Sequence, residues 1–197
     1  MQTANAVPSI PKVTATNRAA RVSQEDLDPN KRYLSLTVVR GNAFVDFLNV
    51  RTDESLSIAV SFLKNRFSTR QVLCSAEPVF DESFLFEFSG ENNNMKFDAA
   101  TMLKLSQPIH LTILKHRKNE KAQVIGTKLV DWRSLLFCNQ VEINSEILPI
   151  SMQQKGSLGV LTLHLDLAPA LSQTELLNEE SVNKQISLET RFEQESI

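Results

Sequence analysis

Apolar and polar residues alternate along much of the middle of the chain, the pattern typical of β-strands with one buried face. The stretch Glu77–Phe88 carries it most clearly, because phenylalanine occupies every second position at Phe84, Phe86 and Phe88. A strand with three phenylalanines on one face cannot stand alone, so other strands must supply the facing layer. We therefore expect this stretch to lie in the core of a β-sheet protein.

Other segments with the same period, separated by turn residues, supply that layer. The segment Ala43–Val50 is apolar but leaves open whether it is a strand or a connecting loop. With no long helix among them, these segments predict an all-β fold, an antiparallel eight-stranded β-sandwich. The further strands are expected at Tyr33–Val39, Ser55–Leu63, Phe67–Cys74, Ile109–Lys115, Gln123–Val130, Val141–Ile150 and Val160–Leu167.

Several local signals refine this prediction. Arg40-Gly41-Asn42 is expected to end the first strand, and Gly126 within a strand indicates a bulge or a close approach of backbone. Phe97–Leu105 has room for one or two helical turns. Asp131–Phe137 predicts another helical turn, with its aspartate as the N-cap. Val141–Ile150 is expected to be interrupted in its middle, near an Asn-Ser pair.

Composition divides the chain into three parts. Residues 1–30 are poor in large apolar side chains and predict a disordered N-terminal tail. Residues 31–169 form the predicted domain. Residues 170–197 predict a polar helical tail or linker, where Ser172 and Glu175 have the spacing of a capping box and acidic residues outnumber basic ones. Whether this tail begins a coiled coil or leads to a further domain stays open.

Length and charge exclude several classes of protein. A chain of 197 residues with a net charge of −2 has room for one ordinary domain and gives no reason to expect a nucleic-acid partner. We find no signal-peptide pattern and no apolar run of membrane-spanning length, so a soluble intracellular protein is expected. Cys74 and Cys138 lie in apolar runs and are expected to be buried thiols in a reducing compartment.

The motifs together resemble a C2 domain. Glu77–Phe88 resembles the aromatic strand of that family, with its leading acidic pair. Val124-Ile125-Gly126, ahead of Trp132, resembles the segment that follows the third loop of a C2 domain. Gly159–Leu167 resembles the closing strand. Further runs are similar to the N-terminal C2-like region in the family of the centrosomal protein of 76 kDa. These are Asp28–Leu48, Asn65–Phe88, Thr101–Leu111, Asp131–Leu136, Gly159–Gln173 and the tail Glu175–Arg191.

This resemblance implies a location in the cytoplasm and cytoskeleton, at the centrosome and its centrioles. It also implies centriolar partners, including a centriole-capping coiled-coil protein, and a role in limiting centriole reduplication and in centriole and cilium organisation. Family members continue into a transglutaminase-like domain that this sequence lacks. We therefore expect a fragment, a short isoform or a truncated relative.

Calcium binding is not expected, although many C2 domains bind Ca²⁺ through clustered aspartates. The expected third loop, Lys115–Gln123, holds the single acid Glu120 among basic residues. The expected first loop, Arg40–Glu54, offers Asp46, Asp53 and its final glutamate, but with arginines among them. No metal site and no cofactor are predicted.

The same basic loop has a possible binding role. Its cations, helped by a lysine on the next strand, would suit a phosphoinositide headgroup or an acidic partner, at about 1 kcal/mol per basic residue near an anionic surface. An ordinary solvated loop is the alternative, and no aromatic or leucine tip is seen that would anchor it in a bilayer. The candidate residues are His116, Arg117, Lys118, Lys121 and Lys128.

Enzymatic activity is not predicted. Nucleophilic catalysis needs a serine or cysteine beside an oriented histidine. Both cysteines are assigned to the core, while His110 and His164 occupy the outward positions of alternating strands. Trp132 is assigned to packing, and no Gly-rich phosphate loop or paired-carboxylate motif is seen. The sequence therefore favours a protein-interaction module, with peripheral membrane binding as the alternative.

Overall fold

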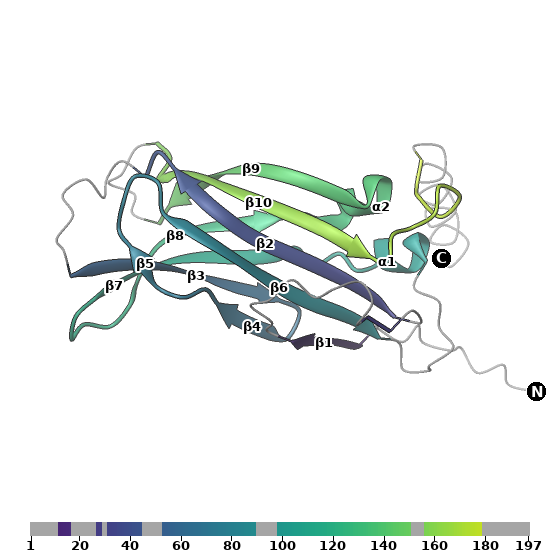
Figure 1. Cartoon of the computed structure of the whole chain (residues 1–197), viewed down its shortest axis with the longest axis horizontal. Helices are drawn as coiled ribbons and strands as arrows, with labels where there is room; N and C mark the ends of the chain where they lie inside the picture. The colour runs from purple at the N-terminus through teal and green to yellow at the C-terminus, as the bar shows by residue number, and fades with distance from the viewer. Residues whose placement is uncertain are drawn as a thin grey trace, which may run out of the picture.

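Two antiparallel sheets, packed face to face, carry most of the chain in the computed structural model (Figure 1). It describes residues 12–16, 27–28, 31–44, 53–89, 98–150 and 156–178. Sheet A has the strand order β1, β6, β2, β10, β9. Its strands are β1 (Lys12–Thr16), β6 (Val79–Ser89), β2 (Arg32–Asn42), β10 (Gly159–Ala168) and β9 (Gln140–Pro149).

Sheet B has the order β8, β7, β3, β4, with a short β5 also paired to β3. Two residue pairs join the sheets at one corner, where Gly126 and Thr127 of β8 face Pro149 and Leu148 of β9. The antiparallel β-sandwich is confirmed, and the described residues form ten strands rather than the expected eight. The strands of sheet B are β8 (Gln123–Val130), β7 (Ile109–Arg117), β3 (Glu54–Phe62), β4 (Asn65–Ser68) and β5 (Val72–Leu73).

The core lies between the sheets, and β6 supplies its phenylalanines as predicted. Phe84, Phe86 and Phe88 are fully buried. Phe62 reaches them from β3, with ring centroids 5.3 Å from Phe86 and 5.9 Å from Trp132 in edge-on contacts. The Trp132 ring nitrogen donates to the carbonyl of Gln107 at 3.0 Å, so its one polar atom is satisfied inside the core.

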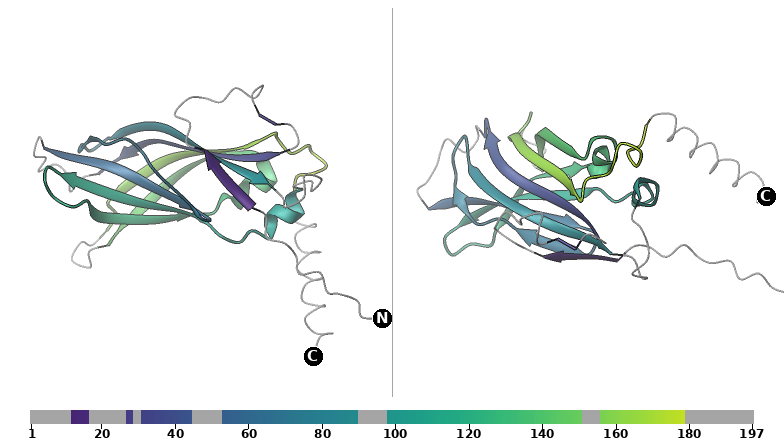
Figure 2. Two further views of the ribbon diagram at one scale, coloured as in Figure 1. Left: turned by 90° about the horizontal axis from the view of Figure 1, so that it is seen from below. Right: turned by 45° about the vertical axis from the view of Figure 1, so that its right-hand side comes forward.

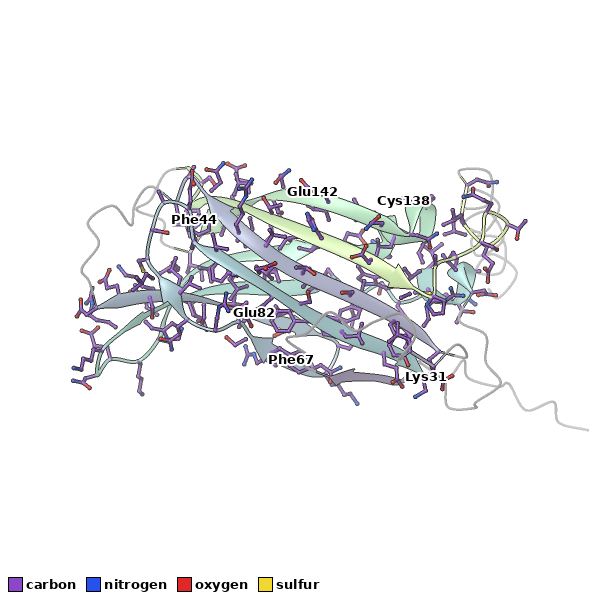
Figure 3. The ribbon with its side chains drawn as sticks, in the orientation of Figure 1. Lys31, Phe44, Phe67, Glu82, Cys138 and Glu142 are labelled. Atoms are coloured by element: carbon purple, nitrogen blue, oxygen red, sulfur yellow. The ribbon has the colours of Figure 1, made fainter. Side chains whose placement is uncertain are left out.

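The edge of the sandwich away from the β8–β9 corner is closed by side chains. The ring of Phe67 on β4 stacks on Phe84 of β6 with centroids 5.9 Å apart (Figure 3). Arg70 donates to the carbonyl of Phe80 at 3.0 Å, and its guanidinium lies 3.6 Å from the carboxylate of Glu82. These contacts link β4 and the residue Arg70 that follows it to β6, where no backbone pairing between the two sheets is described.

Three local expectations about strand boundaries prove wrong. β2 continues through Gly41 to Asn42, because its pairing with β6 resumes after a register shift between Val38 and Arg40. β9 is continuous, because pairing with β10 carries it through its polar middle. Phe67–Cys74 divides into β4 and β5. Near the N-terminus, β1 pairs with the open edge of β6.

The glycine signal on β8 is confirmed. The register with β7 shifts by one residue between Ile113 and Leu114, which places a bulge next to Gly126. A Cβ added there would lie 2.5 Å from Leu158 Cδ1 and 2.7 Å from Ile147 Cγ2. The glycine is therefore required by close packing.

Three short helical segments lie together at one end of the sandwich, opposite the β7–β8 loop (Figures 1 and 2). They are α1 (Ala99–Leu103), the 3-10 turn η3 (Trp132–Ser134) and α2 (Leu135–Cys138). The predicted cap is confirmed, since the side chain of Asp131 accepts from the backbone N–H of Arg133 at 3.0 Å. No helix within the described residues is long and apolar enough to cross a membrane.

The two cysteines differ in environment. Cys74 is buried as expected, and burial raises the pKa of its thiol. Cys138 is exposed at the end of α2, which corrects the expectation of a second core thiol (Figure 3). In a four-residue helix, Leu135 and Leu136 occupy the buried face, so the next two residues turn toward solvent.

The chain beyond β10 packs against the helical end of the domain. The side-chain amide of Asn139 makes two hydrogen bonds to the backbone of Leu171: it donates to the carbonyl at 2.8 Å and accepts from the N–H at 2.6 Å. The backbone N–H of Ser172 donates to the carboxylate of Glu175 at 2.9 Å, one half of the predicted capping box. Residues 173–175 form a turn followed by a bend at Leu176, and residues 179–197 of the predicted tail lie outside the described residues.

Candidate binding surfaces

A buried carboxylate anchors a cluster of charges at the end of the sandwich that carries the β7–β8 loop. Glu54 begins β3 and is only 4% exposed. Its Oε2 lies 2.7 Å from Nζ of Lys115, and its Oε1 accepts from Nε of Arg117 at 3.0 Å. Arg117 also lies 3.3 Å from Glu120 in the loop. The cluster thus ties β3, β7 and the loop together.

Hydrogen bonds favour the ionised form of the Glu54 carboxyl group. The hydrogen bond from Lys115, and next that from Arg117, lowers the pKa of the Glu54 carboxyl below its ordinary value, against the opposing effect of burial. Both of its oxygens are engaged by cations. Glu54 was one of the acids considered for calcium, and its carboxylate is committed to an internal ion pair.

The basic loop is shorter than expected. β7 extends to Arg117, so the loop proper comprises residues 118–122, and Lys118 and Lys121 are exposed on it. His116 and Arg117 belong to the strand, and both have protein partners. Lys128 does not join the loop at all, because it pairs with Leu111 in the middle of β8. Only two of the five candidate residues are therefore presented together at the loop.

A serine–histidine pair is present that the sequence did not reveal. Ser57 on β3 and His116 on β7 lie 2.7 Å apart, Oγ to Nε2, on the outer face of sheet B. The two residues are 59 positions apart in the chain, so only strand register brings them together. Ser57 is buried, and the carboxylate of the neighbouring Glu54 is held by Lys115 and Arg117. The pair therefore lacks the accessible nucleophile that catalysis needs.

The outer face of sheet A carries polar side chains that hydrogen-bond to one another. Across β9 and β10, His164 lies 3.0 Å from the carboxylate of Glu142, and Thr162 donates to Asn144 at 2.8 Å. Both histidine predictions for the strands hold, since His164 and His110 face outward. Side chains of this kind are typical of a solvated sheet face.

Large apolar side chains are exposed instead around the β8–β9 corner. On β8, Leu129 is 53% and Val124 is 41% exposed, while Leu148 and Ile150 at the end of β9 are 61% and 52% exposed. Leu148 pairs with Thr127, and the N–H of Ile150 donates to the carbonyl of Ile125 at 3.2 Å. We call these four exposed residues the corner patch. Strand alternation alone did not reveal it, because the sequence does not show where the two sheets meet.

Comparison with known proteins supports the family resemblance. The family model described as the CEP76 C2 domain matches residues 25–173. The centrosomal protein of 76 kDa from Mus musculus is 30% identical over 195 residues, which cover 93% of this chain and 29% of that protein. The Danio rerio protein of the same name is 32% identical over 171 residues, covering 81% of this chain and 25% of its own. The chain thus spans less than a third of the length of these curated relatives.

Solved structures resemble the chain in fold. The structure of CC2D1B, which coordinates ESCRT-III activity during the mitotic reformation of the nuclear envelope, gives a TM-score of 0.54 at 19% identity, covering 79% of this chain and 63% of that one. A C2 domain of plant extended synaptotagmin 1 gives 0.49 at 15% identity, covering 74% and 100% of the two chains. The strand arrangement and the family match together establish that this chain belongs to the CEP76 C2 domain family.

Proposed function

We propose that the chain is a non-catalytic interaction and targeting module of a centrosome- and centriole-associated protein. The observation that carries this proposal is the family match over residues 25–173, together with relatives named as centrosomal proteins. As part of a longer protein, the module would help to limit centriole reduplication and to organise centrioles and cilia, with centriolar proteins such as a capping coiled-coil protein as partners.

The charge cluster supports a module that works without calcium. Ca²⁺ requires six to eight oxygen ligands, supplied in many proteins by several free carboxylates. Here the buried Glu54 is neutralised by Lys115 and Arg117. Its carboxylate is engaged in ion pairs between β3 and β7 and is not free to coordinate Ca²⁺.

The location of the tagged chain in dividing cells tests this proposal. The chain should concentrate at centrioles or basal bodies, together with markers of those structures, in the presence and absence of a calcium chelator. A uniform distribution, or accumulation on membranes, would contradict the proposed function. Proximity labelling from the same tag would then identify the proteins within reach.

A second candidate function is calcium-independent binding to anionic membranes, including phosphoinositides. The exposure of Lys118 and Lys121 at the loop favours it. The engagement of Arg117 by two carboxylates weighs against it, since Lys118 and Lys121 alone would contribute only about 2 kcal/mol near an anionic surface. Flotation of the chain with phosphatidylcholine vesicles, with and without phosphoinositide, tests it. Lys118→Glu should abolish any binding that depends on the loop.

A further inference from the structure

We propose that the corner patch is the docking surface for an acidic amphipathic segment of a protein partner. This inference rests on the proposed function and names the surface through which the module would bind its partner. The patch comprises Val124, Leu129, Leu148 and Ile150. Isolated apolar residues on a surface are ordinary, but a contiguous exposed group is typical of an interaction site.

Strand register makes these four side chains neighbours. Leu148 lies directly opposite Thr127, and Leu129 is two residues further along β8 on the same face. Such diagonal neighbours are within reach of one another's side chains. Ile150 is two residues beyond Leu148 and bonds to the backbone of Ile125, next to Val124. Along β8 the patch extends for about 17 Å, roughly the length of three helical turns.

The charges beside the loop end of the patch favour an acidic partner. One end adjoins the β7–β8 loop, because Gln123 begins β8 directly after that loop. Lys118 and Lys121 are exposed there, and neither forms an ion pair with a residue that the structure describes. An apolar stripe with carboxylates at one end would therefore meet an apolar surface with Lys118 and Lys121 at its loop end.

A protein segment fits this surface better than a membrane does. The apolar side chains stand on the sides of strands rather than at a loop tip. Glu146 lies on the outer face of β9, two residues before Leu148, and Glu142 lies on the same face. An anionic bilayer laid against the patch would meet these carboxylates, whereas a single helix or strand can pass beside them.

Two matched double variants separate the patch from exposed apolar residues elsewhere. Leu129→Thr with Leu148→Thr removes the centre of the patch, and threonine is well tolerated in exposed strand positions. Leu73→Thr with Val79→Thr removes two side chains that are 72% and 57% exposed on other strands. Both variants of the full chain should keep the unfolding temperature of the wild type. Centrosomal enrichment should fall about tenfold in the first and stay unchanged in the second.

The outcomes distinguish this proposal from the proposed function. If the wild-type chain fails to reach the centrosome, the proposed function fails. If the wild type and the patch variant are enriched equally, the function stands and the patch proposal is overturned. Should the patch variant unfold, Lys118→Glu with Lys121→Glu tests the same surface from the loop, where no core residue is changed, and should reduce the enrichment as well.

A photo-crosslinker identifies the occupant directly. Benzoylphenylalanine in place of Leu148 should crosslink to a protein segment with apolar residues at helical spacing and flanking Asp or Glu, and the same probe at Leu73 should not. Crosslinking to lipid, to a second copy of this chain, or to basic segments would overturn the proposal. Vesicles of phosphatidylcholine and phosphatidylserine should bind the wild type and the Leu129→Thr, Leu148→Thr variant equally. Selective loss of vesicle binding in that variant would make the patch a membrane site instead.

Discussion

Glu54 and Arg117 face each other across β3 and β7, with Oε1 of the glutamate 2.5 Å from Nη2 of the arginine. The glutamate is almost fully buried, while the arginine side chain is 38% exposed. Lys115, two residues earlier on β7, holds the second carboxylate oxygen. The carboxylate thus binds two cations on one neighbouring strand, and it fastens the loop-bearing ends of β3 and β7 to each other.

The acid stability of the domain should depend on Glu54. Its pKa is lowered in the folded state, so the ion pair stabilises the fold above the ordinary value of 4.5. That contribution is lost as the pH falls through the lowered folded-state pKa. Glu54→Gln should lower the Tm by about 2–4 °C at neutral pH and remove this part of the acid dependence. The variant Glu146→Gln, at an exposed position of β9, should follow the wild-type curve. Identical pH profiles for the wild type and Glu54→Gln would contradict the prediction.

The aromatic core should respond very differently from the surface to the same substitution. Phe62→Ala removes a buried ring that contacts Phe86, Phe88 and Trp132, and should cost about 3–5 kcal/mol in unfolding free energy. Phe137→Ala removes a ring that is 43% exposed on α2 and should cost no more than about 0.5 kcal/mol. Denaturant unfolding measures both values. Equal losses would show that the ring of Phe62 is not part of a packed core.

Asn139 should control the attachment of the segment after β10. Its side chain makes two hydrogen bonds to Leu171, whereas its backbone carbonyl accepts from the N–H of Leu167. Its φ of 57° is left-handed, so Asn139→Gly keeps the backbone and removes only the side chain. We expect amide exchange to rise at Leu171 and Leu177 in this variant, but not at Leu167. Unchanged exchange at Leu171 would mean that packing alone holds the segment.

Close packing at the sheet corner should make Gly126 hard to replace. Gly126→Ala would place a methyl group 2.5 Å from Leu158 Cδ1 and should destabilise the domain by about 1–3 kcal/mol. Leu158→Val shortens the side chain that the methyl group would meet, so the double variant should recover part of the loss. A double-mutant cycle by thermal unfolding measures the coupling. Strictly additive effects would rule out this contact as the cause.

The sequence by itself determined the layers of this protein. The two-residue period of Phe84, Phe86 and Phe88 specifies which side of β6 is buried, because a strand alternates its side chains between two faces. The N-cap at Asp131 and the bulge at Gly126 follow equally from local rules of backbone geometry. The family resemblance also rests on such motifs, and it was confirmed.

Only the tertiary structure decided which charges neutralise each other and which apolar residues remain exposed. Glu54 meets Arg117 across 63 positions of sequence, and Leu148 joins Leu129 only because β8 and β9 touch at one corner. Cys138 lies outside the core for the same kind of reason, since the neighbouring elements cover a single face of α2. Strand periodicity specifies the faces of each strand. The partners of each face depend on register and sheet order, which arise from contacts distant in the chain.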